Sequence, residues 1–221
     1  MVAFTDILGY QQLDVDSRKL ADSLFSKMAN ALQEKHLLIG SFDLHEWLSD
    51  EQLINETISS NEQERERAMQ EAVNENIAVS MISDSFVCVV DLSKNNEDQR
   101  KLLVSAFVKI VAAYNSALWR EGLVLRGGIS YGEFYTNTPL INNPSAYMGK
   151  AIMRAHDAEG DIEAACICAE ERAVEILKRY YDVNAASIFI DSNAESELCT
   201  AQVYSKNLIQ FDFLRAQNLG L

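Results

Sequence analysis

Two β-type runs separated by only two residues are the feature that most constrains this fold. Ile77–Ile82 and Ser85–Val90 are joined by Ser83 and Asp84, which is the length of a tight hairpin connection. The spacing predicts two antiparallel strands with Asp84 at their tip. From Gln99 to about Trp119, apolar side chains recur at helical spacing and charge is too scarce for a free surface helix. We expect that helix to cover one face of a sheet.

The rest of the chain predicts further strands and helices around this hairpin. An amphipathic helix is expected from Ser17 to about Lys35, with Ser17 as its cap. The order of elements predicts one domain over residues 1–221, of the α+β class: a ferredoxin-like sandwich with helices packed on a mostly antiparallel sheet. The other expected elements are a strand that ends near Asp6, strands Leu123–Ser130 and Glu133–Tyr135 joined by a turn at Tyr131-Gly132, helices Ala146–Glu159 and Glu170–Tyr181, and strands within Ala185–Ile190 and Val203–Leu214.

The composition narrows the class of partner. The formal net charge of −14 argues against a nucleic-acid template or an anionic membrane as the main partner, because both need clustered Lys and Arg. An acidic protein that handles a polyanion would need a metal ion to mediate. No apolar run approaches the roughly 20 residues of a membrane span, and no charged-then-apolar leader precedes the first strand. We therefore expect a folded protein in the cytoplasm.

The first ten residues place a carboxylate before a glycine turn. Val2–Tyr10 is a short apolar run that includes Asp6 and then bends at Gly9. A strand that delivers a carboxylate to its end, followed by free backbone N–H groups, suits a metal ion and a polyphosphate. An Asp after a strand is also a common turn former or helix cap. In a ferredoxin-like arrangement Asp84 would lie beside Asp6, and two such oxygen ligands favour Mg²⁺ or Mn²⁺.

Four separated motifs carry a resemblance to a known family. They are Asp6-Ile7-Leu8-Gly9-Tyr10, then Ile82-Ser83-Asp84-Ser85-Phe86, then Arg126-Gly127-Gly128-Ile129-Ser130-Tyr131-Gly132, and last Tyr147-Met148-Gly149 followed by Ala151, Ile152 and Ala155. In this order they resemble the motifs of the class III nucleotidyl cyclases, over residues 2 to about 160. Glycines within a strand, as in the third motif, often mark a place where another backbone or a ligand comes close.

The resemblance implies a cyclase sandwich and a site with two metal ions. Asp6 and Asp84 would hold two Mn²⁺ or Mg²⁺ ions with the Ile7 carbonyl, and the backbone N–H groups of Leu8, Gly9 and Tyr10 would hold the β- and γ-phosphates. The products would be a 3′,5′-cyclic nucleotide and pyrophosphate. In this family the site is completed across a dimer interface, so the resemblance also implies a homodimer.

The sequence departs from the family at the residues that read the base and stabilise the transition state. The two purine-reading places hold Ser80 and Ala146, and the places of the transition-state Asn and Arg hold Met153 and Asp157. The nearest cationic candidates for charge stabilisation are Arg154, Lys150 and Arg126. For Arg154 and Lys150 a solvated helix face is an equal alternative.

Loss of the purine readers resembles the pyrimidine cyclases of bacterial antiphage systems, the Pycsar cyclases. That resemblance implies a uridylate cyclase that converts UTP into cyclic UMP, which acts on a separate effector. Three alternatives stay open. The substrate can be CTP or a purine nucleotide, or the chain can be a silent module that binds nucleotide or dimerises. A polymerase-like palm is the third, but no basic groove for a template is evident.

Overall fold

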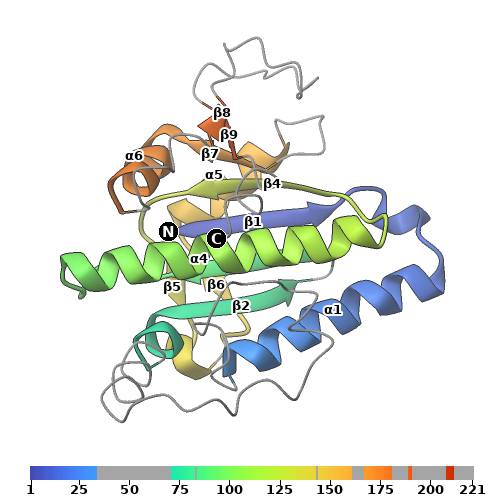
Figure 1. Ribbon diagram of the computed structural model, residues 1–221, viewed down its shortest axis with the longest axis horizontal. Coiled ribbons are helices and arrows are strands. Elements are labelled where there is room, and N and C mark those ends of the chain that lie inside the picture. The colour runs from blue at the N-terminus through green and yellow to red at the C-terminus, as the bar shows by residue number, and fades with distance from the viewer. Residues whose placement is uncertain are drawn as a thin grey trace, which may run out of the picture.

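A seven-stranded sheet forms the frame of the molecule (Figure 1). The computed structural model describes residues 1–33, 71–82, 84–142, 144–160, 167–180, 189–190 and 208–211. The strand order in the sheet is β2-β3-β1-β4-β7-β9-β8. Helices pack on both faces, and a separate two-stranded ribbon lies beside the sheet. The predicted α+β class, with helices on a mostly antiparallel sheet, is confirmed.

The first strand lies in the middle, as the ferredoxin-like arrangement predicts. Strand β1 (Val2–Ile7) pairs antiparallel with β3 (Ser85–Val90) on one side and with β4 (Leu125–Ser130) on the other. Strand β2 (Ile77–Ile82) pairs antiparallel with β3 in the register of a tight hairpin, with Ile82 opposite Ser85. The hairpin prediction is therefore confirmed. It places the hairpin tip at the same end of the sheet as the end of β1.

The far side of the sheet contains a strand that the sequence did not reveal. Strand β7 (Ile167–Glu170) pairs parallel with β4, and β9 (Leu208–Phe211) and β8 (Phe189–Ile190) continue antiparallel beyond it. Such a short apolar run shows neither strand alternation nor helical spacing, so its pattern alone does not predict a strand. The sheet is mixed, with one parallel pair among the described strands.

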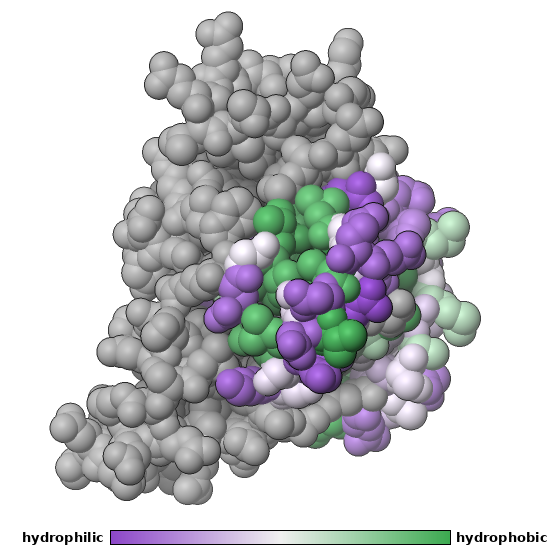
Figure 2. Space-filling model, turned by 90° about the vertical axis from the view of Figure 1, so that its right-hand side faces the viewer, coloured by the Kyte–Doolittle hydropathy of each residue, from purple (hydrophilic) through white to green (hydrophobic). Residues whose placement is uncertain are grey.

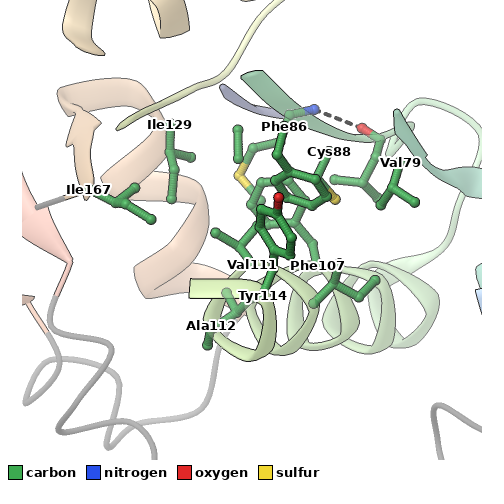
Figure 3. Close-up of a cluster of buried hydrophobic side chains, with 14 of the residues drawn as sticks. Val79, Phe86, Cys88, Phe107, Val111, Ala112, Tyr114, Ile129 and Ile167 are labelled. Carbon is green, nitrogen blue, oxygen red and sulfur yellow. Dashed lines mark hydrogen bonds between the residues drawn. The ribbon is translucent and has the colours of Figure 1, made fainter. Parts of the chain in front are cut away.

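Among the described helices of ten residues or more, three cover one face of the sheet and one covers the other. Helices α1 (Val15–Gln33), α4 (Glu97–Arg120) and α6 (Glu171–Tyr180) share the larger core with side chains from that face. Tyr114 and Phe107 of α4 pack against Phe86 and Cys88 of the sheet (Figure 3). Helix α5 (Lys150–Gly160) packs on the opposite face in a smaller core.

Two helices begin earlier than predicted because their caps lie earlier. The Asp14 carboxylate accepts a hydrogen bond from the Ser17 N–H at 2.7 Å, so Asp14 and not Ser17 caps α1. At α4, the Asn96 side chain accepts from the Gln99 N–H at 2.9 Å and the Gln99 side chain accepts from the Asn96 N–H at 3.1 Å. This reciprocal pair is a capping box, and α4 therefore begins before Gln99.

The segment after β4 differs from the prediction. The residues expected as a partner strand of β4 contribute β5 (Tyr135–Thr136), which pairs with β6 (Tyr147–Met148) in the separate ribbon. Helix α5 consequently begins at Lys150 rather than at Ala146. The described residues also include two short 3-10 helices, η1 (Tyr10–Gln12) and η2 (Leu140–Asn142), and a helical segment over 71–76 before β2. None of the described helices is long and apolar enough to cross a membrane.

Some predicted features lie outside the described residues. They are the end of the first helix at Lys35, Ser83 of the hairpin connection, and most of the two C-terminal segments within which β8 and β9 are found.

Candidate active site

Asp6 lies near the end of the central strand β1, and the adjacent strands β3 and β4 each place a polar side chain opposite it. Its register partner on β3 is Ser85 and its register partner on β4 is Arg126. The Ser85 hydroxyl donates a hydrogen bond to Asp6 Oδ1 at 3.3 Å. Side chains directly opposite one another on paired strands point to the same face, so all three lie on the face that α5 covers. The sheet itself therefore positions this group.

Asp84 is brought to Asp6 by the hairpin. It precedes Ser85 directly, at the turn between β2 and β3, and is half-buried. Burial raises the pKa of the Asp6 carboxyl, and the negative charge of Asp84 raises it further. The pairing of Asp6 with Ser85 therefore brings the hairpin tip, with Asp84, to the end of β1 that carries Asp6. A cation placed between the two carboxylates would relieve the repulsion between their charges.

Glu159 is a third carboxylate at this site, and the sequence did not single it out. Its side chain is 6% exposed and forms an ion pair with Arg126. The charge of Glu159 also raises the pKa of Asp6, whereas Ser85 and then Arg126 lower it. One signal was available: Glu159 follows Ala151 and Ala155 at helical spacing, on the buried stripe of α5, where an unpaired carboxylate would be costly.

The donor chemistry of this site fits a divalent cation. Asp6 and Asp84 supply the hard oxygen atoms that Mg²⁺ and Mn²⁺ take, with room for phosphate oxygens and water in the remaining positions. The Ile7 side chain is buried in the core, so only its backbone carbonyl could serve as a further ligand. Among the described residues, no group of three or more His, Cys, Asp or Glu side chains is arranged to hold a metal ion. Two carboxylates would leave coordination positions for the oxygens of a substrate.

The turn after β1 differs in one respect from the phosphate loop implied by the family. The Leu8 N–H donates to the Val124 carbonyl at 2.9 Å and is therefore occupied within the fold. Gly9 adopts a left-handed conformation with φ 72°, which leads into η1. Gly9 and Tyr10 thus stay as candidates for holding phosphate. Arg18 is an additional cation at this turn, with its guanidinium 5.2 Å from the centre of the Tyr10 ring.

Tyr147, the first residue of the fourth motif, lies beside the base-reading position Ser80 and directly follows the other one, Ala146. The Ser80 hydroxyl is 2.6 Å from the Tyr147 hydroxyl and donates to the Pro144 carbonyl at 2.9 Å. Ala146 is exposed, and its N–H donates to the Asn137 side chain at 3.1 Å. Burial raises the pKa of Tyr147. The side chain that lies beside the Ser80 hydroxyl is therefore an uncharged phenol.

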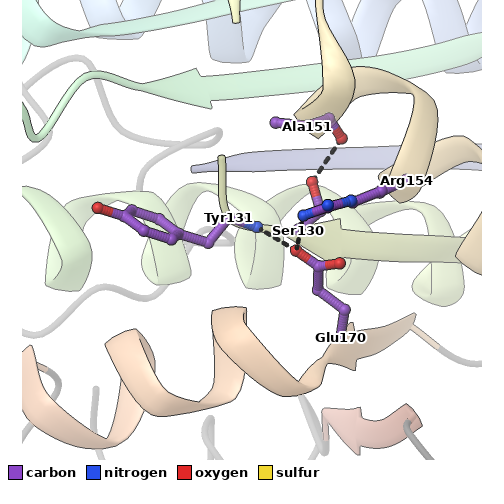
Figure 4. Close-up of polar contacts among 5 residues, drawn as sticks. All are labelled: Ser130, Tyr131, Ala151, Arg154 and Glu170. Carbon is purple, nitrogen blue, oxygen red and sulfur yellow. Dashed lines mark hydrogen bonds and ion pairs between the residues drawn. The ribbon is translucent and has the colours of Figure 1, made fainter. Parts of the chain in front are cut away.

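The other two cationic candidates are Lys150, the first residue of α5, and Arg154, one turn later in the same helix. The helix crosses β4 so that Ala151 accepts a hydrogen bond from the Ser130 hydroxyl (Figure 4). Farther along the helix, Glu159 forms an ion pair with Arg126. Arg154 pairs with Glu170 at 3.9 Å, and Glu170 also accepts from the Tyr131 N–H at 2.8 Å.

This arrangement separates Arg154 from the carboxylates. Arg154 and the Tyr131 N–H both contact Glu170. Tyr131 follows Arg126 by five residues, and five residues of extended chain span about 16 Å. Lys150 is exposed at the first position of α5, at the same distant end of β4. One chain therefore brings Arg126 to Asp6 but does not bring Lys150 or Arg154 there.

Apolar side chains are exposed at both ends of this arrangement. Strands β1 and β2 point to the right in Figure 1, and Figure 2 shows that side, where apolar residues gather with hydrophilic residues around them. Ile82, at the end of β2, is 43% exposed. On the ribbon and on α5, Tyr135, Met148 and Met153 are exposed by 62 to 65%. Exposed apolar groups of this size are typical of contact surfaces.

Comparison with known proteins gives similarity in structure and none in sequence. No protein-family model matches the chain, and no curated protein matches it. The adenylyl cyclase CyaB from P. aeruginosa is similar over 95% of this chain and 91% of its own, with 12% identity and a TM-score of 0.49. The guanylyl cyclase Cya2 is similar over 96% and 89%, with 12% identity and a TM-score of 0.48.

A third solved structure is the dimeric guanylyl cyclase domain of the RhoGC fusion protein from Blastocladiella emersonii. It is similar over 80% of this chain and 82% of its own, with 13% identity and a TM-score of 0.46. Similarity at this level does not assign an activity, which has to come from the residues of the site.

Proposed function

We propose that this protein is a metal-dependent nucleotidyl cyclase that converts UTP into 3′,5′-cyclic UMP and pyrophosphate. The observation that carries the proposal is the pair of carboxylates, Asp6 and Asp84, which the central strand and the hairpin tip place together at one end of the sheet. Turn formation alone does not explain why two carboxylates that repel one another lie at the same end of the sheet. The resemblance of the four motifs to those of class III cyclases supports the same assignment.

Each residue of the site has a defined task in this reaction. Asp6, Asp84 and the Ile7 carbonyl would hold two divalent cations, Mn²⁺ or Mg²⁺, while Gly9 and Tyr10 orient the β- and γ-phosphates. When bound, the cations would lower the pKa of the ribose 3′-hydroxyl and neutralise the leaving pyrophosphate. The 3′-oxygen forms a bond to the α-phosphorus, the bond from that phosphorus to the bridging oxygen breaks, and the 3′-hydroxyl proton passes to solvent.

The geometry also supports a homodimer with shared sites. The carboxylates lie at the C-terminal end of α5, whereas Lys150 begins the helix and Arg154, one turn later, pairs with Glu170. A two-fold axis across the α5 face would bring Lys150 and Arg154 of one chain to the carboxylates of its partner. The symmetry would create two such sites in each dimer. The exposed Tyr135, Met148 and Met153 on this side of the molecule suit burial against a second copy.

Mixing two inactive variants is expected to restore activity if the sites are shared. Asp6→Ala and Arg154→Ala break different halves of the proposed site. After subunit exchange, half of the dimers would carry one variant of each kind and one intact site, giving about a quarter of the wild-type rate. A mixture of Asp6→Ala with Asp84→Ala serves as the control and should stay inactive, because both changes lie in the same half. A sharing model is wrong if the first mixture stays equally inactive.

The residues at the two base-reading positions favour a pyrimidine base over a purine. Ser80 and Ala146 lack the length to read a purine edge, and the phenol of Tyr147 lies at Ser80. We therefore favour a pyrimidine, UTP first and CTP second, and a role in bacterial antiphage defence in which cyclic UMP acts on a separate effector.

An assay with each of the four nucleoside triphosphates and Mn²⁺ tests the substrate. We expect cyclic UMP as the main product, identified by chromatography and mass spectrometry, because small residues occupy both purine-reading positions. Cyclic AMP or cyclic GMP as the sole product would contradict the pyrimidine assignment. Binding of nucleotide without turnover of any of the four would instead favour a silent module, which the exposed Met153 in place of a transition-state Asn also allows.

A further inference from the structure

We propose that Glu159 is a positioning residue of the carboxylate site: by holding Arg126, it keeps that guanidinium from binding Asp6 and leaves the Asp6 carboxylate open to a divalent cation. The inference rests on the proposed metal-dependent function. It assigns a task to a residue of α5 that lies outside the four motifs.

The strand register makes Asp6 and Arg126 natural partners. They are directly opposite on antiparallel strands β1 and β4. Such pairs have Cβ atoms about 5 Å apart, and opposite charges there attract one another. A guanidinium that bound Asp6 in this way would take up the oxygens that a cation needs, since Arg and carboxylate pair through two parallel hydrogen bonds. The strand pairing alone would therefore allow Arg126 to block the cation site at Asp6.

Helix α5 supplies a competing carboxylate from above the sheet. Glu159 is 6% exposed in its side chain, Arg126 is 27% exposed, and the two form an ion pair. Because both charges are largely removed from water, separating them would leave an uncompensated buried charge, which is strongly unfavourable. The pair therefore holds Arg126 more firmly than a solvent-exposed pair would. With Arg126 held by Glu159, the Asp6 carboxylate stays available to a divalent cation, whereas an arginine bound to Asp6 would repel one.

Direct measurement of Mn²⁺ binding by electron paramagnetic resonance tests the proposal without relying on turnover. Glu159→Gln keeps the shape of the side chain and removes its charge, so Arg126 would turn to Asp6. We expect the apparent Mn²⁺ affinity to fall roughly 10- to 100-fold, the range typical of residues that orient metal ligands. The double variant Arg126→Met/Glu159→Gln, which has no competing guanidinium, should regain affinity to within about threefold of wild type, below the loss range for such residues.

The controls separate this inference from the proposed function. Glu97→Gln breaks the exposed ion pair with Arg179, 3.6 Å long, and should leave Mn²⁺ binding unchanged. Thermal unfolding checks that each variant is folded, and Glu159→Asp, which keeps the charge one methylene shorter, replaces Glu159→Gln if that variant does not fold. Equal Mn²⁺ affinity of wild type and the Glu159 variant overturns the inference, and so does a double variant as weak as the single one. Wild-type protein without Mn²⁺ binding that depends on Asp6 overturns the proposed function as well.

Discussion

Replacing Asp6 with Asn is expected to abolish cyclic nucleotide formation. The change keeps the size of the side chain but removes the charge that would hold a divalent cation beside Asp84. The lost stabilisation of the transition state amounts to several kcal/mol, or about a thousandfold or more in rate. Steady-state assays with UTP and Mn²⁺ measure it. Asp84→Asn should have a similar effect, because both carboxylates serve the same cations.

The stability of the Asp6→Asn variant distinguishes a functional carboxylate from a structural one. Burial and the charges of Asp84 and Glu159 disfavour the ionised form of Asp6. The neutral amide should therefore leave the metal-free protein as stable as wild type or slightly more stable, which is common at sites that bind a ligand. Added Mn²⁺ should raise the melting temperature of wild type and not that of the variant.

A matched control is the same substitution at an exposed carboxylate. Asp16 lies in the first turn of α1, its side chain 94% exposed, where it pairs with Lys19. Asp16→Asn should leave turnover and the Mn²⁺ effect unchanged, since exposed ion pairs contribute little. An Asp6→Asn variant that retains wild-type turnover, or one that simply unfolds, would place Asp6 among structural residues and remove the main support for a metal-dependent cyclase.

The sequence predicted those parts of the fold and site that depend on local pattern. The two-residue connection between Ile82 and Ser85 indicated the hairpin, and the position of Asp6 at the end of a strand indicated a carboxylate at one end of the sheet. These signals are contained within a few adjacent residues. Their convergence followed once β1 was placed beside the hairpin, because register is fixed by the buried face.

The features that the sequence missed depend on contacts between distant segments. The parallel pairing of Ile167 with Gly127 and the ion pair of Glu159 with Arg126 join residues more than thirty positions apart. Nothing near Glu159 shows that its partner lies on a strand beneath the helix. Similarly, the pairing of the Leu8 N–H with Val124 removes a predicted phosphate donor through a contact with another segment. Local sequence pattern identifies candidate ligand-binding groups, and tertiary contacts determine which of these groups remain available to bind a ligand.

One long-range feature was nevertheless signalled locally. Gly128 lies in the middle of β4, and glycine inside a strand indicates close approach of another backbone. The approaching backbone is that of α5: a Cβ at position 128 would clash with the Ala155 carbonyl oxygen and lie 2.7 Å from the Ala158 Cβ. Helix α5, which carries Glu159, Arg154 and Lys150, can therefore pack directly against β4 because Gly128 has no side chain.

Gly128→Ala is expected to give the largest loss of stability among the single changes considered. The added methyl group meets backbone, which cannot rotate away, so α5 has to lift from the sheet. Overpacking of this kind costs about 3 kcal/mol in the free energy of unfolding, or roughly 10 °C in melting temperature for a chain of this length. Thermal and urea unfolding measure the loss. Turnover should fall as well, because both ends of α5 carry residues of the proposed site.

Gly160→Ala is the matched control, at the last residue of the same helix. Among the described residues, a Cβ there meets no atom within 4 Å, and the backbone needs no left-handed conformation. The control should change the free energy of unfolding by less than about 1 kcal/mol, and in the stabilising direction, because alanine restricts the unfolded chain. Equal melting temperatures for the Gly128 and Gly160 variants would mean that α5 does not rest on β4 as described. The link between the helix, Arg126 and Asp6 would then lose its structural basis.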